Sequence, residues 1–94
     1  MYLAEVVGDV VSTHKNERLE GKRLLLVQRL TLDMKPEGTE TICLDVVDAG
    51  VGDKVLVVQE GSSARKIFGD DWIPVQAVIV GVLDRVDLFG RQVL

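Results

Sequence analysis

The stretch DVVDAGVGDKVLVVQEGSSAR, which runs from Asp45 to Arg65, decides the fold of this chain. Two glycine-containing segments, AGVG and EGSS, bracket the short apolar run Val55–Val58. A short run of mostly β-branched residues bounded by turn residues is typical of a strand. The stretch therefore predicts a turn, a strand and a second turn. Its first turn also raises the alternative that the loop holds a phosphate.

The residues of the first turn argue against a phosphate site. A Walker-type loop ends in Gly-Lys-Ser/Thr, so that a lysine and a hydroxyl reach the phosphate and its magnesium. Gly50-Val51-Gly52-Asp53 supplies neither group. A dinucleotide fingerprint needs a third glycine and a following helix, whereas here a strand follows and Asp53 brings a negative charge. We interpret the segment as a tight turn that leads into a strand.

Strand patterns dominate the rest of the chain. We expect the first and last strands to bend at Gly8 and Gly81, because glycine inside a strand often marks a bend. Such short strands predict an all-β fold, a small barrel or sandwich, with residues 1–94 forming a single domain. The expected strands are Tyr2–Val11, Arg23–Leu32, Glu40–Val47, Asp53–Gln59 and Val75–Val86, with turns or loops at Lys15–Gly21, Pro36–Gly38, Ala49–Gly52 and Gly69–Asp71.

Two shorter segments complete the organisation. One short helical turn is expected at Ser62–Phe68, with Ser62 or Ser63 as its N-cap. The C-terminal segment Leu88–Leu94 is either docked on a neighbouring subunit or frayed, and the sequence leaves both open.

Several strands are apolar on both faces, and this predicts an oligomer. Leu56 and Val58 alternate with Val55 and Val57, and the second and fifth expected strands show the same pattern. Strands of this kind are buried on both sides, but no helical pattern is present to cover a sheet. Since 47% of the residues are hydrophobic, we expect the outer face of the barrel to pack on copies of the same chain.

Composition and charge exclude several classes of function. The net charge of −4 is the opposite of what binding to nucleic-acid phosphates requires. The single cysteine, Cys43, and the single histidine, His14, offer no metal site and no nucleophile–base pair, so neither enzyme nor cofactor is expected. The N-terminus lacks the pattern of a signal peptide and no apolar run reaches membrane-spanning length, which predicts a cytoplasmic protein without a membrane partner.

One binding class stays open as the alternative. A five-stranded barrel of the OB type can bind single-stranded nucleic acid or another ligand through aromatic side chains in a basic groove. Aromatic residues make up only 4% of this chain, and none lies in the second or third expected strand. The residues therefore disfavour this reading.

Taken together, the motifs resemble the EutN/CcmL family of bacterial microcompartment vertex proteins. The resemblance covers almost the whole chain, through LAEVVGDVVSTHK, LEGKRLLLVQ, LDVVDAGVGDKVLVVQEGSSAR and PVQAVIVGVLDRV. Its most specific parts are the turn at Asp45–Leu56 and the Gly-Ser-Ser-Ala-Arg segment at Gly61–Arg65.

The resemblance implies a small OB-like barrel assembled as a ring of five copies. The implied function is structural, since flat hexameric and pseudohexameric tiles cannot close a polyhedral shell and pentamers supply the curvature at its vertices. Five heterologous contacts that close on a rotation axis form a ring. The implied partners are four further copies of the chain and the hexameric shell proteins, and the implied location is the microcompartment shell in the cytoplasm.

The resemblance also implies which residues form the subunit interface and line the five-fold axis. Arg65 is expected to donate hydrogen bonds to a neighbouring subunit, because its planar guanidinium suits several acceptors at once. Two positions depart from the family, which commonly has glycine in place of Asp48 and aspartate in place of Gln76; the first affects the turn and the second a subunit contact. The expected interface residues are Asp48, Ala49, Gly50, Val51, Gly52, Gly61, Ser62, Ser63, Ala64 and Arg65.

Overall fold

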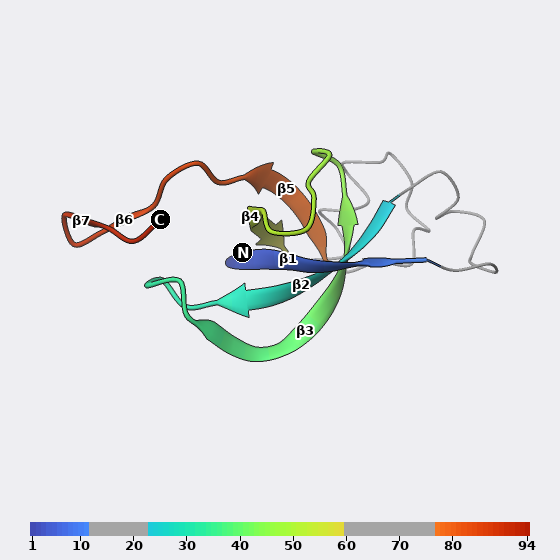
Figure 1. The fold of residues 1–94 in the computed structure, drawn as a ribbon, viewed down its shortest axis with the longest axis horizontal. Helices are drawn as coiled ribbons and strands as arrows, with labels where there is room; N and C mark the ends of the chain where they lie inside the picture. Colours follow the sequence, from blue (N-terminus) through green and yellow to red (C-terminus); the bar gives the residue numbers. More distant parts are fainter. Residues whose placement is uncertain (12–22, 60–76) are drawn as a thin grey trace.

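The protein is a closed five-stranded β-barrel, seen in a computed structural model that describes residues 1–11, 23–59 and 77–94 (Figure 1). Around the barrel the strands follow the order β1-β2-β3-β5-β4, and β1 pairs with β4 to close it. The pair β3–β5 is parallel and the other pairs are antiparallel. The barrel strands are β1 (Tyr2–Val10), β2 (Arg23–Leu30), β3 (Pro36–Asp45), β4 (Lys54–Val58) and β5 (Val78–Val82).

This architecture confirms the predicted all-β class and selects the barrel over the sandwich. The described residues contain no helix, and none of them forms an apolar helix long enough to cross a membrane. The expected helical turn at Ser62–Phe68 and the loops at Lys15–Gly21 and Gly69–Asp71 lie outside the described residues.

The core lies inside the barrel and is formed by alternate residues of each strand. These inward side chains are almost completely inaccessible to solvent, and burying a side chain of the size of valine or leucine stabilises the fold by about 1.5–3 kcal/mol. The core cluster comprises Tyr2, Ala4, Val6, Leu25, Val27, Cys43, Ala49, Val55, Val57, Ala77 and Ile79.

Several of the residues between these core positions are also apolar, as the sequence pattern predicted. Leu24 and Leu26 of β2, and Leu56 and Val58 of β4, point outward and are only partly buried. The barrel of one chain therefore leaves apolar surface exposed on its outer face.

The connection between β2 and β3 corrects one predicted turn. The turn is formed by residues 31–35, where the amide of Met34 donates to the carbonyl of Thr31 and the amide of Thr31 donates to the carbonyl of Lys35. The prediction of a turn at Pro36–Gly38 is wrong, because β3 already begins at Pro36, which pairs with Leu30. Proline is tolerated at the first residue of a strand, so it marks the start of β3 here.

The predicted strand Val75–Val86 extends too far at its C-terminal end. β5 ends at Val82 instead of continuing to Val86. The chain then forms a separate two-stranded hairpin of β6 (Asp87–Leu88) and β7 (Arg91–Gln92). In Figure 1 this hairpin lies beyond the ends of the barrel strands, so the C-terminal segment forms an arm that projects from the barrel.

Candidate functional site

The loop between β3 and β4 is organised by the carboxylate of Asp45. This side chain is only 1% exposed. Its oxygens accept hydrogen bonds from the amides of Val47, at 3.1 Å, and Ala49, at 3.1 Å from the nearer oxygen. An aspartate that accepts from amides two and four residues later holds the loop in one conformation.

The second half of the loop is a tight turn tied to β1. The amide of Asp53 donates to the carbonyl of Gly50 at 3.0 Å, and the amide of Gly50 donates to the Asp53 carboxylate at 2.8 Å. Gly52, the third residue of this turn, has a φ of 95°. A type II turn requires a positive φ at its third residue, and this favours glycine there. The amide of Gly52 donates to the carbonyl of Val6, and the amide of Val6 donates to the carbonyl of Asp53, both at 2.9 Å.

These bonds explain why the loop is not an anion site. A phosphate-binding loop offers free backbone amides. Here the amides of Val47, Ala49, Gly50, Gly52 and Asp53 all donate to acceptors of the same chain. The interpretation of this segment as turn chemistry therefore agrees with the structure.

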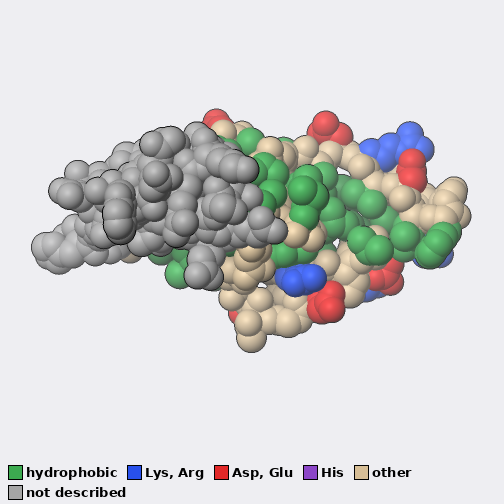
Figure 2. Space-filling model, turned by 180° about the vertical axis from the view of Figure 1, so that it is seen from behind, with side chains coloured by type: hydrophobic (Ala, Val, Ile, Leu, Met, Phe, Trp, Pro, Cys, Tyr) green, Lys and Arg blue, Asp and Glu red, His purple; other side chains and the backbone are tan. Residues whose placement is uncertain are grey.

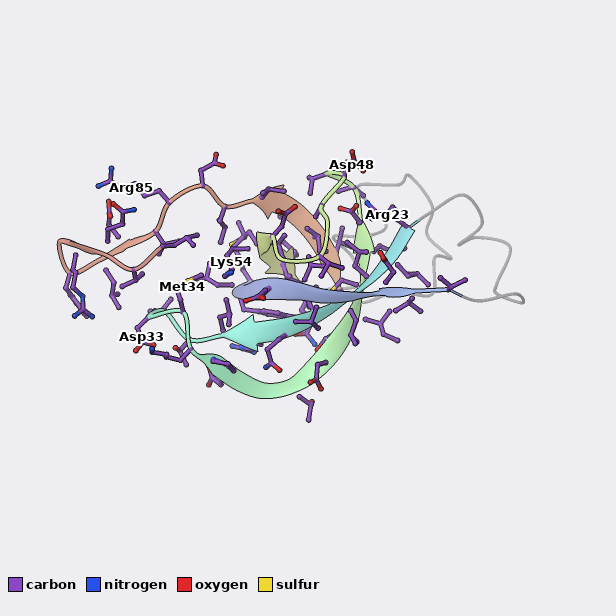
Figure 3. All side chains as sticks on the ribbon, viewed as in Figure 1. Arg23, Asp33, Met34, Asp48, Lys54 and Arg85 are labelled. Atoms are coloured by element: carbon purple, nitrogen blue, oxygen red, sulfur yellow. The ribbon has the colours of Figure 1, made fainter. Side chains whose placement is uncertain are left out.

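The side chain of Arg23, at the start of β2, binds the β3–β4 loop from its outer side. Its Nη1 atom lies 2.8 Å from the carbonyl oxygen of Ala49 and 3.2 Å from a carboxylate oxygen of both Asp45 and Asp48. Its Nη2 atom lies 3.6 Å from a carboxylate oxygen of Asp9 on β1. Figure 3 shows Arg23 and Asp48 pointing toward one another at the edge of the barrel.

Sequence reasoning missed Arg23, because the partners of a strand residue depend on register. In the barrel Arg23 lies directly opposite Asp45 in the β2–β3 pair. Opposite charges at facing positions of adjacent strands stabilise a sheet. The available signal was the arginine at the start of a strand and the aspartate at the end of the next one.

The backbone of Asp48 explains the departure noted in the sequence. Its φ is 59°, in the left-handed region that glycine adopts without strain and aspartate tolerates better than most residues. Its side chain is 97% exposed and reaches Arg23. The carboxylate of Asp48 therefore points away from the turn and contacts Arg23, a contact that glycine at this position could not make.

The predicted interface residues that the structure describes differ in their exposure. Ala49 belongs to the core of its own barrel, so it does not offer a surface to a neighbour. Asp48, Val51 and Gly52 are exposed and Gly50 is partly buried. The segment Gly61–Arg65 lies outside the described residues.

The interior of the barrel holds the only cysteine of the chain beside Tyr2. Burial raises the pKa of the Cys43 thiol to about 11, so the thiol stays protonated at neutral pH. Burial also raises the pKa of Tyr2, and the guanidinium of Arg29 lies 4.7 Å from the centre of the Tyr2 ring. Among the described residues, no group of His, Cys, Asp or Glu side chains could hold a metal ion.

The chain is thus a closed β-barrel that exposes apolar side chains on its outer face and holds its β3–β4 loop by hydrogen bonds within the chain. The chain belongs to the EutN/CcmL family, since the model described as "Ethanolamine utilisation protein EutN/carboxysome" matches residues 1–84. This match ends before the C-terminal hairpin.

Individual relatives agree with the family. The microcompartment shell vertex protein GrpN of Rhodospirillum rubrum (strain F11) is 46% identical over 87 residues, which cover 93% of this chain and 97% of GrpN. The carboxysome shell vertex protein CcmL of Synechocystis sp. is 44% identical over 88 residues, covering 94% of this chain and 87% of CcmL. The structure of the pentameric GrpN shell protein superimposes with a TM-score of 0.83 at 43% identity, covering 94% of this chain and all of GrpN. These relatives are structural shell proteins.

Proposed function

We propose that this chain forms a homopentamer that occupies the vertices of a bacterial microcompartment shell. The observation that carries the proposal is the closed barrel with an apolar outer face, on a chain whose relatives are shell vertex proteins and include a pentamer. In this role the protein catalyses no reaction. It forms the five-fold vertices that flat tiles cannot provide. Its partners are four copies of itself and the hexameric or pseudohexameric tiles of the shell. The shell lies in the cytoplasm.

The exposed part of the β3–β4 loop belongs to the proposed subunit interface. Val51 is 63% exposed on a turn that hydrogen bonds hold rigid. A rigid exposed valine loses little conformational freedom when it packs on a neighbour. We assign the contact to Asp48, Gly50, Val51 and Gly52, and extend it to the Gly61–Arg65 segment on the family resemblance.

The first test is the mass of the assembly in solution. Multi-angle light scattering should give a mass near five times 10.3 kDa. Replacing Val51 with aspartate, at a position where the backbone hydrogen bonds are unaffected, should lower this mass without changing the circular dichroism spectrum. A wild-type protein that remains monomeric at micromolar concentration contradicts the pentamer.

The second test addresses the vertex role. Co-expression with a hexameric shell protein should give closed polyhedral particles by electron microscopy, whereas the hexameric protein alone should give sheets or tubes. Equal yields of closed particles with and without this chain contradict the proposal. The alternative of a single-strand-binding module predicts salt-dependent binding to a fluorescent oligonucleotide, and the net charge of −4 disfavours it.

A further inference from the structure

The C-terminal hairpin has little support from its own chain. Leu88 pairs with Arg91 and Asp87 pairs with Gln92, and among the described strands β6 and β7 pair only with each other. Below the pairs, the amide of Val93 donates to the carbonyl of Val86 at 2.9 Å. A two-stranded hairpin alone is marginally stable in water. An ordered arm of this kind gains stability from a surface on which it packs.

Phe89, at the tip of this arm, has an unfavourable backbone conformation and an apolar side chain exposed to solvent. Phe89 and Gly90 have φ angles of 52° and 77°, as a type I′ turn requires. This turn prefers Asn-Gly, and a bulky residue at positive φ is a genuine outlier. The side chain of Phe89 is also 99% exposed. A residue that is unfavourable by both measures within its own chain points to a contact outside it.

A matching surface lies on the outer face of the barrel. Leu26 of β2 pairs with Ile42 of β3 on one side and with Gly8, next to Val7 in β1, on the other. Ile42 is 52% exposed and Val7 42%, with Leu26 partly buried between them. We call Val7, Leu26 and Ile42 the outer strip. Hydrophobic side chains also gather on the surface seen from behind in Figure 2, between the barrel and the end that carries the hairpin.

Charges beside the two surfaces are complementary. Glu40 is exposed two residues before Ile42 and therefore lies on the same face of β3. Arg91 is exposed two residues after Phe89 on the arm. An aromatic tip with an adjacent arginine is the composition typical of the residues that dominate the energy of protein interfaces.

We propose that the arm of one subunit docks on the outer strip of the next copy in the ring, with Phe89 against Ile42 and Arg91 toward Glu40. This inference rests on the proposed ring. Because the arm and the strip are different surfaces, the contact is heterologous, and repeating it by rotation closes a ring. It adds to the contact at the β3–β4 loop and uses a segment that the family match does not include.

The informative substitution is Phe89→Asn. Asparagine is favoured at this turn position, so the hairpin itself is kept or strengthened while the apolar side chain is lost. We expect a loss of about tenfold in affinity at each subunit contact. Since a released subunit breaks two contacts, exchange between 15N-labelled and unlabelled rings should be about 100-fold faster, at a urea concentration where wild type exchanges measurably. Native mass spectrometry follows the mixed rings, and Phe89→Leu should stay near wild type.

A double-mutant cycle tests the acceptor surface. Ile42→Asn should also speed exchange, and the Phe89→Asn/Ile42→Asn double variant should exchange no faster than the quicker single variant, because both remove one contact. Val82 on β5 is 42% exposed and serves as the matched control; Val82→Asn should combine multiplicatively with Phe89→Asn. If subunits of Phe89→Asn exchange no faster than those of wild type, the arm does not contact the neighbouring subunit. If the effects of Phe89→Asn and Ile42→Asn multiply, the outer strip is not the surface that the arm contacts. A wild-type protein that is monomeric contradicts the proposed ring, and with it the proposed function.

Discussion

Replacing Asp45 with alanine should be the most damaging single change in the β3–β4 loop. The carboxylate is 1% exposed and accepts hydrogen bonds from the amides of Val47 and Ala49 as well as from Arg23. A hydrogen bond to a charged group contributes about 1.5–3 kcal/mol, and a donor left without its partner in a buried position costs about 1–3 kcal/mol. Discounting the half-exposed arginine, the two amides alone predict a loss of about 3 kcal/mol.

The size of this effect sets the assay. For a chain of this length, about 3 kcal/mol corresponds to a fall of roughly 12–24 °C in Tm. Urea unfolding followed by circular dichroism should be measured at one fixed subunit concentration, because assembly stabilises the folded chain by mass action. Asp45→Asn keeps one carbonyl oxygen in place for the Val47 amide, so it should lose less than Asp45→Ala.

Two controls decide whether the reasoning holds. Asp9→Ala removes a carboxylate that also reaches Arg23, at 3.6 Å, but is 57% exposed and lies outside the proposed subunit contact; a solvated ion pair contributes little to stability. Hydrogen exchange should be faster at the amides of Val47 and Ala49 in Asp45→Ala and unchanged in Asp9→Ala. The reasoning is refuted if Asp45→Ala destabilises the protein no more than Asp9→Ala does.

Three further predictions concern the backbone, the thiol and the core. Because Asp48 has a φ of 59°, Asp48→Gly should be about 1 kcal/mol more stable than Asp48→Ala in urea unfolding; the reverse order would show that this backbone conformation is not adopted. Burial raises the pKa of Cys43 from 9.0 to about 11, so the folded state holds the thiol proton more tightly than the unfolded state, and stability should fall as the pH rises from about 9 to 11. Cys43→Ala should lack this part of the pH dependence, and a thiol reagent at pH 8 should label wild type only on unfolding. Leu25 is fully buried, so Leu25→Ala should lower the free energy of unfolding by about 2–5 kcal/mol. A decrease below about 1 kcal/mol in urea titration would argue against its place in the core.

The strands themselves could be predicted, while their limits could not. Runs of apolar and β-branched residues between turn residues located all five barrel strands, because such residues fit the pleated surface of a sheet. Pro36 and Gly38 suggested a turn by residue type, but the pairing of Pro36 with Leu30 keeps both in β3. Gly81 suggested a bend in a long strand, whereas β5 ends one residue later and the chain goes on to build a separate hairpin.

The site was predicted unevenly for the same reason. The Gly50–Asp53 turn was recognised, since its glycines and aspartate specify local hydrogen bonds within four residues. Its link to Val6 and the contacts of Arg23 with Asp45 and Asp48 join residues far apart in the sequence. Such contacts exist only once the strands have paired in one register, so no local pattern announces them.

By itself the sequence determined the all-β class, the two-faced apolar strands that predict assembly, the absence of phosphate-loop chemistry at Gly50–Asp53 and the family. Each of these follows from residue types at short spacings, or from motifs in a fixed order. Only the tertiary structure decided that Ala49 is buried in its own core, that Arg23 holds the loop, and that Phe89 stands exposed at the tip of an arm. These depend on which strands pair and in which register, because closing the barrel sets which side chains are enclosed and which are left for a neighbour.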